Sequence, residues 1–215
     1  MNLPIEQRHP IMCLTRDGGG AGPSEQARLL CEAGAKWVQL RMKDAAPEAW
    51  LATAKEVVGV CHAFGALCIV NDSVLIAIAA GADGAHLGRH DMDWHHARRM
   101  LGPRKILGGT VNDAEDARRA VASGSLDYAG VGPFRFTGTK KQLAPLLGAE
   151  GIARLVEALG GMPAWAIGGV QPADLPILRA AGASGVAVCG ALYEGDSVHA
   201  SYRAFERAWN NDFSI

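Results

Sequence analysis

One stretch of the sequence, residues 131–141 (VGPFRFTGTKK), combines several residue types that bind phosphate. Thr137 and Thr139 supply hydroxyl groups, and Lys140 supplies a positive charge. Gly138 lets backbone N–H groups approach a ligand closely. A plain surface turn needs only a few Gly, Pro, Asn or Asp residues. The stretch is therefore a candidate phosphate-binding loop, and its place in the fold decides what it can bind.

A second group of polar residues stands in VQLRMKD, at the end of an apolar run. Gln39, Arg41 and Lys43 are spaced by two, so an extended chain places all three on one side. The commoner role of such cations is to lie on the surface with their heads in water. Their convergence at a strand end favours anion binding instead.

Carboxylates follow two further apolar runs. Asn71 and Asp72 come directly after LCIV, and Asp91 stands in HLGRHDM. Asp72 taken alone is most simply a cap of the next helix, SVLIAIAA. Together with nearby cations, Asp72 and Asp91 fit a Mg²⁺ site, because Mg²⁺ is usually held by one or two carboxylates, waters and substrate phosphates. Three histidines beside Asp91 are interpreted as solvent-exposed residues rather than transition-metal ligands: His90, His95 and His96.

Small and hydroxylated residues follow the later apolar runs. Thr110 stands in ILGGTVND, Gly168 and Gly169 stand in AIGGV, and Gly190 begins a predicted short helix in CGAL. Glycines after the seventh and eighth strands, with a short helix N-terminus, form a phosphate site common in eight-stranded α/β barrels.

The elements that must position these residues are short apolar runs alternating with helices. A pattern of helix end, glycine, small residue and apolar run recurs four times, and its glycines suit the left-handed position just past a helix: Gly34, Gly81, Gly124 and Gly182. Four further runs of strand character complete a set of eight: 11–15, 67–70, 105–109 and 164–169.

Helical periodicity fills the intervals. Apolar residues fall on one helical face over 47–63, opened by Pro47, and again over 196–209. Strand and helix alternate without a linker, which predicts an α/β fold, a single (β/α)8 TIM barrel forming one domain over 1–215. A doubly wound open sheet is the alternative, but it usually has fewer strands and a clearer nucleotide fingerprint.

A barrel of this kind carries its site at the C-terminal ends of its strands. The expected arrangement is a monophosphate site at the seventh and eighth loops and a cationic site with carboxylates at the second to fourth. The sixth loop lies between them. No Ser/His/Asp or Cys/His set reads as an activated nucleophile, so the reaction should depend on leaving-group stabilisation.

Composition narrows the class of protein. The 215 residues carry a formal net charge of −1, which excludes a globally basic nucleic-acid binder. The five cysteines form no C-x-x-C pair and mostly stand in apolar runs, as expected of reduced thiols in a cytoplasmic protein. The N-terminus lacks the apolar stretch of a signal peptide, and no apolar run approaches membrane-spanning length.

Seven motifs in order resemble the thiamine phosphate synthase family: VQLRMKD, IVNDS, GADGAHLGRHDM, ILGGTVND, YAGVGPFRFTGTKK, AIGGV and GVAVCGAL. They run from residue 38 to 192, and the longer sixth loop is similar to one branch of the family. The resemblance implies an enzyme that joins a hydroxymethylpyrimidine diphosphate to a thiazole phosphate, giving thiamine phosphate and pyrophosphate. Its implied partners are these small molecules, with no nucleic acid and no membrane, and its implied cofactor is Mg²⁺.

The resemblance also implies residue roles. The diphosphate of the pyrimidine substrate would be held by Gln39, Arg41 and Lys43. Asn71 would contact the pyrimidine or its diphosphate, and Thr110 would lie near both. Mg²⁺ would be bound by Asp72 and Asp91. The thiazole phosphate would be bound by Thr137, Thr139, Gly168, Cys189 and Gly190, and the departing pyrophosphate by Lys140. The implied catalytic residues are Arg41, Lys43 and Lys140.

The chain departs from the family pattern at three positions. Thr110 replaces a serine and keeps its hydroxyl, while Gly138 and Gly190 stand where other small residues are common. Both glycines leave backbone N–H donors available, so modest effects on phosphate affinity are expected.

Three alternatives stay open from the sequence. A thiazole tautomerase on the same barrel would need an acid/base group, but Asn112 stands where such relatives place a histidine. A different phosphate-binding barrel is disfavoured by Asp72 and Asp91. A non-catalytic sensor of a thiamine precursor is the third alternative. The sequence does not decide the oligomeric state or whether the natural thiazole is carboxylated.

Overall fold

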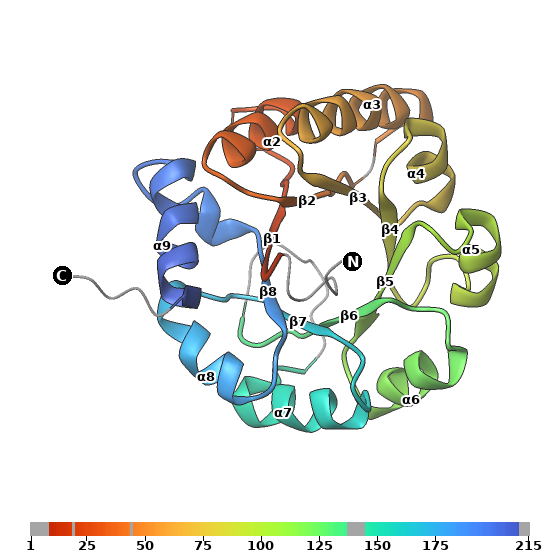
Figure 1. The fold of residues 1–215 in the computed structure, drawn as a ribbon, viewed down its shortest axis with the longest axis vertical. Coiled ribbons are helices and arrows are strands. Elements are labelled where there is room, and N and C mark those ends of the chain that lie inside the picture. Colours follow the sequence, from red (N-terminus) through yellow and green to blue (C-terminus); the bar gives the residue numbers. More distant parts are fainter. Residues whose placement is uncertain (1–8, 19, 44, 137–144, 211–215) are drawn as a thin grey trace.

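Eight parallel strands close into a ring in sequence order, each paired with the next and β8 paired with β1 (Figure 1). The computed structural model describes residues 9–18, 20–43, 45–136 and 145–210. The strands are β1 (Ile11–Leu14), β2 (Trp37–Leu40), β3 (Leu67–Asn71), β4 (Gly84–Leu87), β5 (Ile106–Val111), β6 (Tyr128–Val131), β7 (Ala164–Ile167) and β8 (Gly185–Val188).

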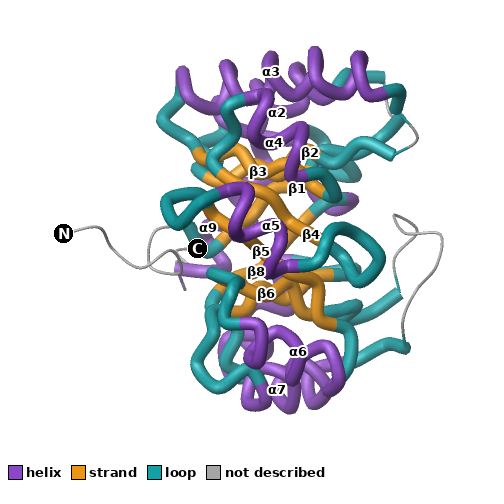
Figure 2. The backbone as a smooth tube through the Cα atoms, turned by 90° about the vertical axis from the view of Figure 1, so that its right-hand side faces the viewer, coloured by secondary structure: helices purple, strands orange, loops and turns teal. Residues whose placement is uncertain are grey.

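Helices follow the strands and surround the ring, as the side view in Figure 2 also shows. The α-helices are α2 (Pro23–Glu32), α3 (Pro47–Ala63), α4 (Val74–Ala80), α5 (Trp94–Leu101), α6 (Ala114–Ser123), α7 (Gly148–Ala158), α8 (Leu175–Ala180) and α9 (Val198–Asn210). Two short 3₁₀ turns, η1 (Pro172–Asp174) and η2 (Gly190–Leu192), follow β7 and β8.

The (β/α)8 prediction is confirmed, and the open doubly wound sheet is wrong. The evidence for a closed barrel is the pairing of β1 with β8, in which Ile11, Met12 and Cys13 lie opposite Val186, Ala187 and Val188. The four glycines expected past helix ends all have positive φ, at +107° for Gly34, +74° for Gly81, +55° for Gly124 and +86° for Gly182. The helix opened by Pro47 also begins where predicted.

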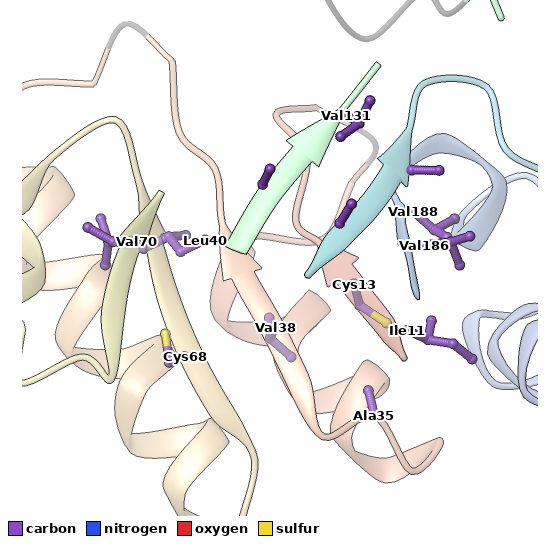
Figure 3. Close-up of a cluster of buried hydrophobic side chains, with 14 of the residues drawn as sticks. Ile11, Cys13, Ala35, Val38, Leu40, Cys68, Val70, Val131, Val186 and Val188 are labelled. Carbon is purple, nitrogen blue, oxygen red and sulfur yellow. The ribbon is translucent and has the colours of Figure 1, made fainter. Parts of the chain in front are cut away.

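Alternation along the strands divides the core into two layers. The outer layer lies between strands and helices, and includes Val38, Leu40, Cys68 and Val70, part of which appears in Figure 3. These positions are fully buried by the amphipathic faces of the helices. The outer layer therefore fixes which strand positions must point the other way, into the barrel.

The inner layer is small and aromatic. Trp37 of β2, Tyr128 of β6 and Trp165 of β7 contact one another edge to face, with ring centroids 4.9–5.4 Å apart. Met12 and Ile69 complete their surroundings. This layer fills the part of the barrel near the N-terminal ends of the strands. The inward positions nearer the C-terminal ends are therefore left for polar side chains.

No helix in the described ranges is both long enough and apolar enough to cross a membrane. The five cysteines are free thiols, and four of them are buried in the core.

Candidate active site

The second strand places an amide side chain in the barrel interior, and two cationic residues follow it at the barrel mouth, the end where the strands terminate. Gln39 is buried, and its Nε2 lies 3.2 Å from Met12 Sδ in the inner layer. Leu40 belongs to the outer layer and Met42 packs against it, so the predicted alternation holds. Arg41 and Lys43 follow the strand end, where Arg41 is partly buried and Lys43 exposed.

Two residues of the β1–α2 connection hold the cation-bearing segment in place. The backbone N–H of Arg41 donates to the buried Thr15 hydroxyl at 2.9 Å. The Asp17 carboxylate accepts from the Lys43 backbone N–H at 3.2 Å and lies 3.6 Å from the Arg41 guanidinium. Thr15 and Asp17 were missed by the sequence interpretation. Their signal was that they too follow a strand end.

The two predicted metal carboxylates lie close together beside Lys43. Lys43 Nζ forms an ion pair with the Asp72 carboxylate. Burial raises the pKa of Asp91 above its ordinary value, the Gly88 backbone N–H opposes this, and the nearby Asp72 charge raises it further. Asp91 Oδ2 accepts that Gly88 hydrogen bond at 2.7 Å. Two repelling carboxylates of this kind are an oxygen-donor set suited to a hard divalent cation.

Asp72 is not the cap of α4, so that simpler interpretation is wrong. Ser73 is the N-cap, and its hydroxyl accepts from the Ile76 N–H at 3.2 Å. Asp72 has φ +66°, the left-handed region that Asp tolerates better than most residues. Its backbone thus turns sharply between β3 and α4, and its side chain is free of the helix.

A chain of hydrogen-bonding groups crosses the barrel interior below the carboxylates. His86 of β4 is buried, and its two ring nitrogens lie 3.0 Å from Tyr128 Oη and 3.0 Å from Thr110 Oγ1. Asn71 is paired with His86 in the β3–β4 register. The predicted Asn71 and Thr110 therefore share one interior surface with a histidine that the sequence interpretation passed over.

The signal for His86 was its inward position on β4, two residues past Gly84. The space for its ring comes from a glycine on the sixth strand. A Cβ atom at Gly130 would lie 3.0 Å from His86 Cε1.

Asn112 has a structural contact. Its side-chain amide donates to the Gly132 carbonyl and so ties the end of β5 to the end of β6. The predicted exposure of His90, His95 and His96 is confirmed.

The glycines after β7 and β8 form the opposite side of the mouth. Gly168 and Gly169 have φ +101° and +64°, and Gly190 begins the η2 turn as predicted. Cys189 precedes that turn, and burial raises its thiol pKa to about 11, so the thiol is neutral at physiological pH. Thr137, Gly138, Thr139 and Lys140 lie outside the described residues.

Of the predicted site residues that the structure describes, Lys43, Asp72 and Asp91 form one charged cluster, and Asp17 joins Arg41 to it. Gln39, Asn71 and Thr110 lie in the interior beneath it. Gly168, Cys189 and Gly190 belong to the loops after β7 and β8. In the described ranges no group of three or more His, Cys, Asp or Glu side chains is placed to hold a metal.

A cavity of about 230 Å³ lies to one side of this cluster, between the β1–α2 connection and the start of α9. Arg16 and Tyr193 line it, with the guanidinium carbon 4.8 Å from the ring centroid. None of the predicted site residues lines this cavity, so it is separate from the strand-end cluster.

Comparison with known proteins identifies the family. The family model described as thiamine monophosphate synthase matches residues 11–192. The chain is 45% identical to the thiamine-phosphate synthase of Bacteroides fragilis over 174 residues, which is 79% of this chain and 85% of the relative. It is 48% identical to the thiamine-phosphate synthase of Salinispora arenicola over 139 residues, 65% of this chain and 66% of the relative.

A solved structure agrees with these matches. The thiamine phosphate pyrophosphorylase from Pyrococcus furiosus superimposes with a TM-score of 0.86 at 27% identity, covering 97% of this chain and 99% of that one. The family match spans every strand of the ring, and therefore both halves of the mouth described above. The chain belongs to the thiamine monophosphate synthase family.

Proposed function

We propose that this protein is a thiamine phosphate synthase, a transferase that joins a hydroxymethylpyrimidine diphosphate to a thiazole phosphate. The products are thiamine phosphate and pyrophosphate. The observation that carries the proposal is the charged cluster of Arg41, Lys43, Asp72 and Asp91 at one rim of the barrel, above a polar interior. A diphosphate leaving group needs such a cluster, and an apolar or purely acidic mouth would not serve it.

The pyrimidine diphosphate binds on the β2–β5 side in this proposal. Arg41 and Lys43 hold the diphosphate, and the segment that carries them is fixed by Thr15 and Asp17. Asn71 and Thr110 face the pyrimidine from the interior, where hydrogen-bonding groups are needed to orient a polar ring, and Gln39 is assigned to the same substrate.

Mg²⁺ is the cation that suits Asp72 and Asp91, since both offer only oxygen and substrate phosphates can complete the coordination. When bound, it would neutralise charge that develops on the departing pyrophosphate. The raised pKa of Asp91 supports the assignment, because burial and the nearby Asp72 charge make an ionised Asp91 costly even with Lys43 close by, and a divalent cation would offset that cost.

The bond changes balance without a protein nucleophile or base. The carbon–oxygen bond to the diphosphate breaks, and pyrophosphate leaves with the electron pair. The thiazole nitrogen supplies its lone pair to form the new carbon–nitrogen bond, and it carries no proton to be removed. Arg41 and Lys43, with Lys140 of the β6–α7 connection, offset the charge on the leaving group.

The thiazole phosphate is assigned to the other side of the mouth. Its proposed contacts are Gly168, the backbone at Cys189 and Gly190, and the hydroxyls of Thr137 and Thr139. The positive φ values of Gly168 and Gly169 support this, because such turns turn successive N–H groups toward an anion.

The rival functions are weaker on specific grounds. Asn112 has no useful pKa for a tautomerase, and its amide is already bonded to the Gly132 carbonyl. A sensor would have no need of leaving-group residues. A cytoplasmic location is part of the proposal, supported by five free thiols where secreted proteins commonly form disulfides.

The test is pyrophosphate release from the pyrimidine diphosphate and thiazole phosphate, with Mg²⁺ and then with excess chelator. Release that requires both substrates and the metal is the expected result. Saturable binding without release would replace the enzyme by a sensor, and conversion of the thiazole alone would make it a tautomerase.

A further inference from the structure

The first residues after β6 are bound to the turn that follows β7. The Phe134 N–H donates to the Ile167 carbonyl at 2.8 Å, and the Arg135 N–H donates to the Gly168 carbonyl at 3.0 Å. The returning chain is fixed as well, since the Leu147 N–H donates to the Pro133 carbonyl at 2.9 Å. The base of this connection is therefore tied to the Gly168–Gly169 turn.

The Arg135 side chain strengthens this link across the turn. Its Nη1 and Nη2 atoms donate to the two carboxylate oxygens of Asp174 at 2.9 and 2.6 Å, the two-pronged geometry in which an Arg–carboxylate pair is strongest. Asp174 is only 8% exposed. Its carboxylate also accepts from the Gln171 N–H at 2.8 Å, so one buried carboxylate joins Arg135 to the segment after the turn.

Close packing makes the turn and Arg135 interdependent. A Cβ atom at Gly169 would lie 2.6 Å from Arg135 Cγ and 2.6 Å from the Phe136 carbonyl oxygen. A Cβ atom at Gly168 would lie 2.8 Å from Pro133 Cα. Both glycines are thus needed for their positive φ and because the chain after β6 lies against them, Pro133 against Gly168 and Arg135 against Gly169.

We propose that Arg135 is a positioning residue that, through Asp174, sets the conformation of the Gly168–Gly169 turn and so the affinity for the thiazole phosphate. The proposal rests on the assignment of that turn to the thiazole phosphate. A Lys at position 135 could not reproduce the two-pronged contact, because an ammonium group is a single point of charge.

The alternative is that Arg135 contacts the phosphate directly, since its side chain is 48% exposed. The two roles differ in what Asp174 does. If Arg135 acts by positioning, loss of the Asp174 charge should be as harmful as loss of Arg135. If Arg135 contacts the phosphate, removing its carboxylate partner should leave affinity unchanged or improve it.

The experiment compares Arg135→Ala, Arg135→Lys, Asp174→Asn and the double variant Arg135→Ala/Asp174→Asn in pyrophosphate-release kinetics. We expect each single variant to raise KM for the thiazole phosphate about tenfold, equivalent to about 1.4 kcal/mol. KM for the pyrimidine diphosphate should stay within about twofold. The double variant should be no worse than either single one, because one link is being removed.

Arg154→Ala is the matched control, since Arg154 is a well-exposed arginine of α7 that forms an ion pair with the exposed Glu150 at 3.8 Å. It should leave both KM values unchanged. A tenfold effect of Arg135→Ala with none from Asp174→Asn would overturn positioning in favour of direct contact. Unchanged KM in all variants would overturn the role altogether.

Hydrogen exchange in peptides spanning 166–175 supplies a readout that needs no turnover. Faster exchange in Arg135→Ala and Asp174→Asn, but not in Arg154→Ala, is expected wherever the overall melting temperature is retained. Unchanged hydrogen exchange in these variants would refute the link between Arg135 and the turn. Absence of pyrophosphate release by the wild-type protein is a separate outcome, and it would refute the proposed function. If Arg135→Ala no longer unfolds cooperatively, Arg135→Lys takes its place. Faster hydrogen exchange over 166–175 in Arg135→Lys would support the link, and unchanged exchange would refute it.

Discussion

Asp72 is the one non-glycine residue in the described ranges with a positive φ. Left-handed backbone costs free energy for a residue with a Cβ atom, although Asp and Asn tolerate it better than most. Such strain persists where surrounding structure holds it, and it occurs most often at functional sites. Here it aims a carboxylate at Lys43 and Asp91 instead of at the helix that follows.

Asp91→Asn should stabilise the metal-free protein while removing its response to Mg²⁺. Burial raises the pKa of Asp91 in the folded state, so the carboxylate begins to cost stability as the pH rises above the ordinary carboxyl pKa, and the cost is complete once the pH exceeds the raised one. Asn keeps an oxygen for the Gly88 hydrogen bond but never ionises. We expect the melting temperature in chelator at pH 7 to rise by about 2 °C, a small shift because the site is partly solvated.

The sign of this effect should follow pH. The gain in melting temperature of Asp91→Asn should disappear as the pH falls below the ordinary carboxyl range, because Asp91 is then protonated and as neutral as the Asn that replaces it. Asp113→Asn is the opposite control: helix N–H groups, the Asp116 amide first, and Arg89 lower the pKa of Asp113, so its loss should lower the melting temperature. A lower melting temperature for Asp91→Asn, or an undiminished Mg²⁺ response, would contradict the assignment.

For individual residues, the sequence predicted the location of those side chains that directly follow a strand. Arg41, Lys43, Asp72 and Asp91 could be named for that reason, and the structure places them together. His86 could not, because a histidine inside an apolar strand gains meaning only from its inward direction and from neighbours on β5 and β6. The capping of α4 by Ser73 instead of Asp72 depended on one backbone angle that residue type does not fix.

Among the elements, β5 makes room for the aromatic layer of the barrel. A Cβ atom at Gly108 would lie 2.2–2.4 Å from two carbons of the Tyr128 ring, and Tyr128 is fully buried. The ring cannot move away, because Trp37 and Trp165 contact it from two sides. Gly108 is therefore required by the packing of the Tyr128 ring and not by the conformation of its own backbone.

Gly108→Ala should destabilise the protein by about 3 kcal/mol or more, the upper range for overpacking a rigid core. Chemical denaturation followed by circular dichroism measures the change. Gly59→Ala is the control, since Gly59 lies in α3 with open space around its missing Cβ, and the same substitution should stabilise by about 0.5–1 kcal/mol. Equal effects at the two positions would show that the interior layer yields easily.

The number and order of the elements were predictable because each strand and helix pair repeats the same signals. Strand bounds agree within two residues, such as 105–109 expected against Ile106–Val111 for β5. The helix expected over 196–209 spans Val198–Asn210. Contacts between connections were not predictable: the Arg135–Asp174 pair joins residues 39 positions apart, and neither residue type announces the other.

The whole molecule is closed by α9, which packs against α2 and α8 near the β1–β8 seam (Figure 1). Phe205 is 1% exposed, and Tyr202 Oη donates to the Gly34 carbonyl at 3.2 Å. The last helix thus joins the two ends of the barrel. Stability of the ring as a whole should be sensitive to this one contact surface.

Phe205→Ala should lower the free energy of unfolding by about 3–5 kcal/mol, the cost of emptying a buried aromatic site. Arg207→Ala, an exposed position on the same helix, should change it by less than about 0.5 kcal/mol. Equilibrium unfolding in urea measures both. A small loss for Phe205→Ala would mean that α9 can detach without opening the seam.

The aromatic layer gives this protein an internal reporter of ring closure. Trp37 and Trp165 stand on β2 and β7, strands separated by β1 and β8, yet their ring centroids are 4.9 Å apart. Two indoles at that separation couple electronically and give a circular dichroism signal that neither gives alone. Because β1 and β8 are the strands that lie between them, the signal should appear in refolding only when the first strand meets the last.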